Sequence, residues 1–210
     1  MVEISDIVQV VPIASEPDRV IWTANPTGKY TISSAYEALR VKTPTVQWAR
    51  LVWGKGPSPH HSFICWLAIL NRLAVKARII RWGLCDDNIC PCCGLSAETM
   101  EHLLFDCSFP SMVWNGVMRY AGVVRPPKPW RWELVWWCRK AGGKSQLAVL
   151  RRHIFCATIY YIWKERNDSV FGNQQVNVQR VINNIRESFF CYSSYFTNRN
   201  FVRLIDQWTV

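Results

Sequence analysis

The chain has 210 residues, a formal net charge of +10 and 50% hydrophobic residues, which is enough for one large domain or two small ones. This hydrophobic content excludes a mainly disordered protein. The longest apolar run covers the ten residues 154–163, so no segment has the roughly twenty apolar residues that a membrane span needs.

The first segments in chain order predict a β-hairpin followed by helices. Residues 1–17 are weakly patterned and are expected to form a linker or a trimmed edge. Residues 18–32 contain two β-branched or aromatic runs around an Asn-Pro-Thr-Gly turn, which is typical of a hairpin. A helix capped by Ser33 or Ser34 should then end before Pro44, and a long helix is predicted over residues 63–82.

The sequence pattern also predicts helices in the second half of the chain. Residues 113–120 suggest a helix, the proline-rich stretch 125–129 is a candidate boundary, and further helices are predicted over 146–168 and 178–189. We therefore expect a domain over 18–124, a linker over 125–145 and a helical C-terminal segment over 146–210. The predicted fold class is mainly α, with a small β-hairpin near the N-terminus and an embedded Cys-Cys-His-Cys module.

Four residues within that first domain have the spacing of zinc ligands. Cys90 and Cys93 form a Cys-x-x-Cys pair in a stretch with Pro91 and Gly94, and His102 and Cys107 follow. Residues 98–105 lack Gly and Pro, so a helix capped by Ser96 should carry His102 and deliver Cys107 at its end. With four protein ligands no position remains for an activated water, so we expect one structural Zn²⁺.

Two alternatives to this ligand set stay open. The four residues can instead be buried, reduced cysteines beside an ordinary helical histidine. Cys92 lies inside the pair and can compete as a ligand, although only Cys90 with Cys93 has the usual spacing of two residues. The other cysteines lie in apolar or helical surroundings that suit reduced thiols, and no secretory signal precedes them, so we expect an intracellular protein, nuclear or cytoplasmic.

The charges divide sharply along the chain. Residues 50–82 hold six basic and no acidic side chains, residues 83–107 hold five acidic and no Lys or Arg, and residues 108–144 hold seven basic and one acidic. An acidic zinc segment between basic flanks predicts that the flanks contact nucleic acid through phosphates. Replacing Glu98 and Glu101 should therefore lower neither the affinity for nucleic acid nor its salt dependence. The candidate contacts are Arg72, Lys76, Arg78, Arg81, Lys128 and Arg131. The alternative is that these residues form an ordinary solvated face.

Several residues carry a resemblance to a known family. The Gly28-Lys29-Tyr30-Thr31-Ile32 run, Val52-Trp53, Arg72-Leu73 and the Cys/Cys/His/Cys pattern resemble the zinc-binding region of plant LINE-type (non-LTR) retrotransposon reverse transcriptases, over roughly residues 18–120. Residues 162–167 resemble the segment that such polyproteins carry before a ribonuclease H domain. The resemblance implies a zinc site at Cys90, Cys93, His102 and Cys107, and a retroelement fragment or a host protein derived from one.

Other motifs do not indicate catalysis. Asp86-Asp87 lacks a third carboxylate for a metal pair, and Gly142 to Ser145 ends like a phosphate loop but reads better as a turn capping the next helix. We expect His60 and His61 to face solvent and His153 to be a core or surface residue. Most tryptophans should be core residues, among them Trp22, Trp48, Trp53, Trp66 and Trp114, whereas Trp130 and Trp132 are candidates for base stacking.

Three functional hypotheses follow from these patterns. The first is a non-catalytic accessory module of a reverse transcriptase that binds RNA or DNA, with a polymerase-related protein as a further candidate partner. The second is a zinc-stabilised protein-interaction domain, and the third is a retroelement remnant without a present role. None of them involves an enzyme activity, a membrane or a small-molecule substrate.

Overall fold

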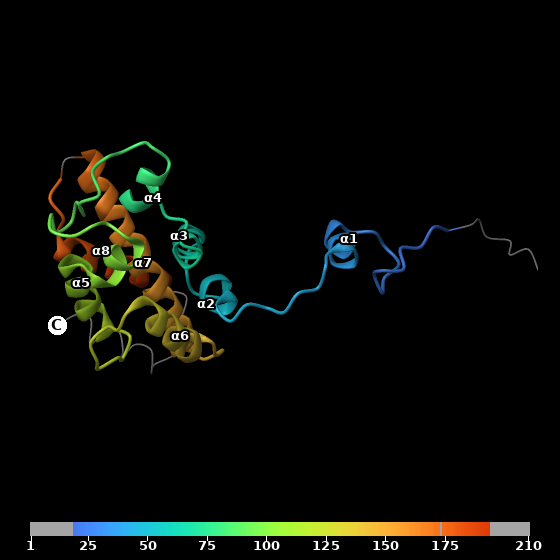
Figure 1. Cartoon of the computed structure of the whole chain (residues 1–210). Helices are drawn as coiled ribbons and strands as arrows, with labels where there is room; N and C mark the ends of the chain where they lie inside the picture. Colours follow the sequence, from blue (N-terminus) through green and yellow to red (C-terminus); the bar gives the residue numbers. More distant parts are fainter. Residues whose placement is uncertain (1–18, 173, 194–210) are drawn as a thin grey trace, which may run out of the picture. The chain divides into compact units, whose positions relative to one another are not determined.

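The computed structural model describes residues 19–172 and 174–193 and divides the chain into two compact units, 1–44 and 45–210 (Figure 1). Each unit is described by itself. The elements are α1 (Ile32–Leu39), α2 (Ala49–Trp53), α3 (Pro59–Ile69), α4 (Lys76–Arg81), the π-helical segment η2 (His102–Asp106), α5 (Ser108–Met118), α6 (Trp130–Ala141), α7 (Gln146–Gly172) and α8 (Val178–Ser193). None of the helices in these described ranges is apolar over a stretch long enough to cross a membrane.

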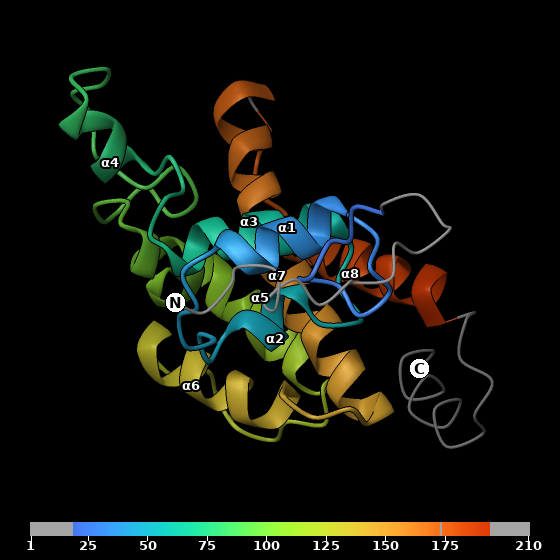
Figure 2. The same ribbon diagram turned by 90° about the vertical axis from the view of Figure 1, so that its right-hand side faces the viewer.

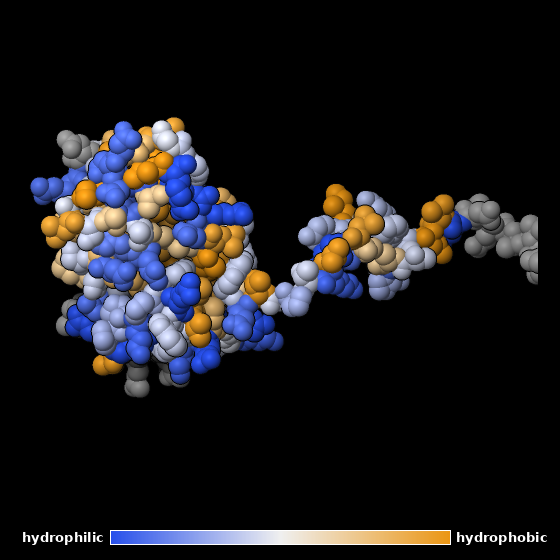
Figure 3. All heavy atoms as spheres, viewed as in Figure 1, coloured by the Kyte–Doolittle hydropathy of each residue, from blue (hydrophilic) through white to orange (hydrophobic). Residues whose placement is uncertain are grey.

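The predicted β-hairpin over residues 18–32 is wrong for the described residues, because residues 19–31 contain a turn and no strand and Ile32 begins α1. The turn is closed by the Trp22 amide donating to the Gly28 carbonyl at 2.9 Å. Two short strands without a third strand or a covering helix are marginal in water. Val20 and Ile32 accordingly remain 103% and 81% exposed, and apolar side chains of this unit lie at its surface in Figure 3.

The helix that follows this turn is confirmed, with its cap shifted by two or three residues. The Thr31 side chain accepts from the Ser34 amide, and the Ser34 hydroxyl accepts from the Thr31 amide, which completes a capping box before α1. Ser34 also accepts from the indole of Trp22 at 2.9 Å. The capping serine therefore joins the helix start to the preceding turn.

The second unit is organised around the long helix α7, which packs against α3, α5, α6 and α8 (Figure 2). Its middle turns are buried on nearly all sides. The core around it is aromatic: the ring centroid of Phe155 lies 5.9 Å from that of Trp114 and 5.2 Å from that of Trp137. Aromatic side chains bury large apolar areas, so this cluster is a main source of stability.

The single long helix predicted over residues 63–82 is two helices, α3 and α4. Asn71 adopts a left-handed conformation with φ of 52° after the end of α3. The Arg72 amide donates to the Leu67 carbonyl at 2.7 Å and the Asn71 amide to the Ala68 carbonyl at 2.9 Å. This is a Schellman motif, in which asparagine tolerates the left-handed position that ends a helix.

The linker expected over residues 125–145 contains α6 instead. Trp130 and Trp137 on α6 are 8% and 0% exposed and belong to the same core as α7. The proline-rich stretch before α6 is tied down by Glu133, whose carboxylate is fully buried and accepts from the Arg125 guanidinium at 2.6 Å and the Lys128 amide at 2.6 Å. Buried acids are held by such partners, so the prolines mark an ordered loop.

Candidate metal centre and basic face

The segment 88–98 is a compact loop closed by backbone hydrogen bonds. The Glu98 amide donates to the Asn88 carbonyl at 2.7 Å, and the Cys90 amide donates to the Ser96 carbonyl at 2.8 Å. At the tip, Gly94 has a φ of 67° and its amide donates to the Cys90 carbonyl at 2.8 Å. Glycine adopts this left-handed conformation at little cost, and the turn brings Cys90 and Cys93 to the same side.

The helix that carries His102 starts later than predicted and is wound differently. It begins at Met100, with Thr99 rather than Ser96 as the cap, because the Thr99 hydroxyl accepts from the His102 amide at 3.1 Å. The Cys107 amide donates to the His102 carbonyl, five residues back, at 2.8 Å. In an α-helix, at about 100° per residue, residues five apart point about 140° away from each other. The π-helical turn instead aligns His102 with Cys107, a use of π-helix typical of functional sites.

The four predicted ligands meet in space. The ligand atoms of Cys90, Cys93, His102 and Cys107 all lie within 4.8 Å of one another, and the Cys93 Sγ lies 3.4 Å from the His102 Nε2. Zinc bonded to sulfur at about 2.3 Å in a tetrahedron separates its ligand atoms by roughly 3.8 Å, so the cluster can close around one ion with small shifts. Three thiols and one imidazole are also the donors that zinc prefers.

Crowding of the thiols supports the same conclusion. The pKa of Cys90 lies far below its usual value, first because the Cys107 thiol donates to its sulfur and then because Cys92 does. The same contacts with Cys90 raise the pKa values of Cys107 and Cys92. A divalent cation bound here would stabilise these thiols as thiolates. Cys92 is close to Cys90 but lies outside the group of four.

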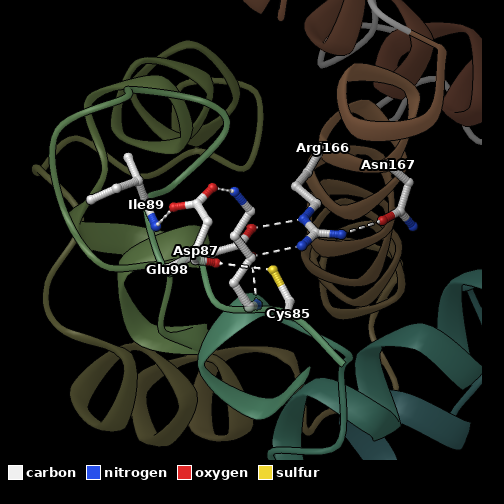
Figure 4. A network of polar contacts seen from close by, with 7 residues as sticks. Cys85, Asp87, Ile89, Glu98, Arg166 and Asn167 are labelled. Atoms are coloured by element: carbon white, nitrogen blue, oxygen red, sulfur yellow. Dashed lines mark hydrogen bonds and ion pairs between the residues drawn. The ribbon is translucent and has the colours of Figure 1, made fainter. Parts of the chain in front are cut away.

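The metal loop is anchored to the core by Glu98, an acid of the zinc segment that was not expected to have a structural role. Glu98 is 0% exposed, and its carboxylate accepts from Arg166 on α7 through two hydrogen bonds, Nε to Oε1 at 2.7 Å and Nη2 to Oε2 at 2.6 Å (Figure 4). Glu98 Oε2 also accepts from the Lys76 amide at 2.7 Å, at the start of α4. Glu98 is therefore a buried anchor of the metal loop, and its predicted lack of effect on nucleic-acid affinity stays a prediction. The signal in the sequence was an acid inside the metal motif, but its partner is 68 residues away.

The predicted nucleic-acid contacts do not all come together. Arg81 and Arg131 line a hollow of about 440 Å³, and Arg78 and Arg81 line a neighbouring hollow of about 310 Å³ together with Trp82. We call Arg78, Arg81, Trp82 and Arg131 the basic face. Arg72 and Lys128 are exposed but line neither hollow, and the Lys76 ammonium forms an ion pair with Asp87.

The division of the tryptophans into core residues and exposed residues differs from the prediction. Trp130, a predicted stacking residue, is 8% exposed and stacks on Phe155 in the core, whereas Trp132 is 69% exposed. Trp53, predicted in the core, is 55% exposed, but Trp114 is fully buried. Trp82, which was not singled out, is 53% exposed, with the Arg78 guanidinium 5.1 Å from its ring centroid.

Comparison with known families agrees with the geometry. Residues 30–114 match the family model described as zinc-binding in reverse transcriptase. That range contains all four residues of the metal cluster and most of α5. No significant match to a curated protein or to a solved structure accompanies it.

Proposed function

We propose that this chain is an intracellular, non-catalytic, zinc-stabilised module that binds nucleic acid and derives from a plant LINE-type reverse transcriptase. The observation that carries the proposal is the basic face beside the metal loop. Arg81 and Arg131 come from segments 50 residues apart in sequence, and they line one hollow together with Thr99 and Glu101 of the metal loop and its helix. Zinc bound at the four-residue cluster would hold that loop in place.

The metal has a structural role in this proposal. When bound by Cys90, Cys93, His102 and Cys107, the ion supplies folding free energy and has no fifth position for a substrate. Other residues of the chain also fix the metal loop and its helix. Glu98 binds the loop to α4 and α7, and the Leu104 carbonyl accepts from the Trp114 indole N–H at 2.8 Å. Phosphate recognition then falls to guanidinium groups on the neighbouring surface.

Single-stranded nucleic acid fits the basic face better than a duplex. Guanidinium groups neutralise phosphates without reading the sequence, and an exposed indole is a platform on which a base can stack. Trp82 supplies such a platform directly after Arg81, and the two residues line the same hollow. Binding should therefore be salt-dependent, with modest sequence preference.

The test is fluorescence anisotropy with a thirty-nucleotide RNA and zinc-loaded protein over a range of salt concentrations. Arg78→Gln with Arg81→Gln should lower the affinity and reduce the log-log salt slope by about 0.7 to 0.9 per lost phosphate contact. Lys42→Gln with Arg119→Gln removes the same charge from other exposed positions and should change the affinity much less. Equal losses in both double variants would contradict a defined binding face.

One observation favours protein interaction as a second function. Phe63 is 49% exposed and Trp53 is 55% exposed, and each packs its ring against Trp66, at centroid distances of 5.7 and 6.3 Å. Exposed aromatic clusters are typical of protein interfaces. Absence of RNA binding tighter than millimolar at physiological salt would leave this function as the better explanation, with a polymerase-related protein as the candidate partner.

A further inference from the structure

A second basic site lies at the start of α7, away from the predicted nucleic-acid contacts. A cavity of about 260 Å³ is lined by four cationic side chains, Arg50, Lys55, Lys144 and Arg152, together with Gly54, Gly143 and Val149. Among these described lining residues there is no Asp or Glu. The site is formed by two segments that are far apart in sequence. One is α2 with the loop after it, and the other is the turn before α7 with the start of that helix.

The cavity walls are braced by arginines. Arg152 is 3% exposed, and its guanidinium donates from Nε to the Lys55 carbonyl at 2.8 Å and from Nη1 to the Gly143 carbonyl at 2.8 Å. Arg50 Nη1 donates to the Gly142 carbonyl at 3.0 Å. The two guanidinium groups thus hold together the loops that form the cavity. Both groups line the cavity, so their positive charge lies at its wall.

The cavity also depends on a glycine. A Cβ added at Gly54 would lie 2.2 Å from the Arg50 carbonyl oxygen and 3.0 Å from the Arg152 Nε. A side chain at this position would displace the arginine that braces the wall. The close approach of backbone to guanidinium therefore requires glycine.

The electrostatics of the cavity favour an anion. α7 is 27 residues long and contributes Val149 and Arg152 to the cavity wall, while the Ser145 hydroxyl accepts from the Ala148 amide at 3.2 Å at the start of the helix. The amino end of a helix carries a partial positive charge, which adds to that of the four cationic side chains. Arginine and lysine together match the oxygen atoms of a phosphate group.

We infer that this cavity binds a phosphate group, with Arg50 and Lys144 as direct contacts and Arg152 as a positioning residue. The group is either a free phosphate or terminal phosphomonoester, or an internal phosphodiester of a nucleic acid. The first source is independent of the function proposed above, whereas the second rests on it. The turn from Gly142 to Ser145, interpreted from sequence as a capping turn, contributes to the site through Gly143 and Lys144.

The experiment titrates zinc-loaded protein with inorganic phosphate by calorimetry, and separately with 5′-hydroxyl and 5′-phosphorylated thirty-nucleotide RNA by anisotropy. Loss of one charge-assisted contact in Arg50→Gln or Lys144→Gln should weaken binding about tenfold. Arg119→Gln, an exposed charge elsewhere, is the matched control. Arg152 is left intact because its replacement would disturb the fold.

Each outcome of this experiment decides the inference. Weaker inorganic phosphate or 5′-phosphoryl binding in the two variants, but not in the control, supports a free or terminal phosphate. Weaker binding of both RNAs without measurable inorganic phosphate binding supports a phosphodiester. If neither ligand responds beyond the control, the site is refuted, while RNA binding that still depends on Arg78 and Arg81 would leave the proposed function standing. Phosphate binding without any RNA binding would refute the proposed function alone.

Discussion

Glu98 in the metal loop and Arg166 on α7 form a buried, bidentate ion pair, with hydrogen bonds of 2.7 and 2.6 Å and side chains that are 0% and 3% exposed. Arg166 also donates to the Asn167 side chain at 3.0 Å (Figure 4). Its guanidinium lies over the ring of Trp163. The pair connects the loop that carries two of the four metal ligands, Cys90 and Cys93, to the central helix. It makes the position of the metal site depend on the core.

Breaking this pair from one side should be costly. Glu98→Gln leaves a buried guanidinium without its counter-charge, and such changes cost roughly 3 to 5 kcal/mol in the free energy of unfolding. Urea unfolding of zinc-loaded protein measures the effect. The control is Lys164→Gln, which breaks an exposed i,i+4 pair with Asp168 and should cost less than about 1 kcal/mol. A similar decrease in the free energy of unfolding in both variants would show that the buried pair contributes no more to stability than the exposed one.

The metal cluster should hold one zinc ion per chain. Cys93→Ser and Cys107→Ser each remove one of four ligands, and because zinc supplies on the order of 10 kcal/mol of folding free energy, both should lose the metal and unfold the surrounding segment. Cys92→Ser is the matched control and should keep it, since Cys92 is outside the group of four. Metal analysis with circular dichroism measures both effects. Full zinc occupancy in Cys93→Ser, or none in the wild type, would overturn the ligand assignment.

The negative charge of Glu101 should weaken nucleic-acid binding, which goes beyond the expectation from sequence that replacing Glu101 does not lower the affinity. Its exposed side chain lines the same hollow as Arg81 and Arg131, so its charge opposes a phosphate there. Glu101→Gln should raise RNA affinity by a few-fold at low salt, with a smaller gain at high salt because of screening. Asp106→Gln, an exposed acid that lines neither hollow, is the control. Unchanged affinity in Glu101→Gln would show that RNA does not enter the hollow.

Two buried imidazoles should make stability depend on pH. His61, expected at the surface, is 6% exposed; burial lowers its pKa from 6.5 to about 4, and burial also lowers the pKa of His153 to about 4. Between pH 6.5 and pH 4 the unfolded chain binds more protons than the folded chain. The contribution of each neutral imidazole to the free energy of unfolding is therefore fully present above pH 6.5 and is lost as the pH falls to 4. Each imidazole contributes about 3 kcal/mol at most to this loss.

The pH effect can be isolated from that of the thiolates by comparing variants. His61→Phe should be less destabilised than the wild type on moving from pH 7 to pH 5, as measured by urea unfolding. His60→Gln removes the neighbouring exposed imidazole and is the control. An identical change in unfolding free energy for His61→Phe and the wild type would refute a role for His61.

Sequence patterns predicted the local features well. The helices around residues 113–120, 146–168 and 178–189 appear as α5, α7 and α8, because their apolar periodicity depends on neighbouring residues only. The Cys-x-x-Cys spacing likewise identified the residues that meet in the metal cluster. Two predictions were wrong: residues 19–31 contain a turn and no strand, and the supposed linker over 125–145 contains a helix that is held in the core by Trp137. Pairing of strands and burial of a helix depend on partners distant in sequence, which local patterns do not specify.

By itself, the sequence determined which donor atoms this protein offers to a metal and where along the chain its positive charge is concentrated. Only the tertiary structure decided what those groups face. Glu98 is paired in the core by Arg166, 68 residues away in sequence, and Arg81 lines one hollow with Arg131 only after folding. Spacing along the chain encodes contacts within a turn or two of helix, whereas burial and charge pairing depend on which distant segments pack together.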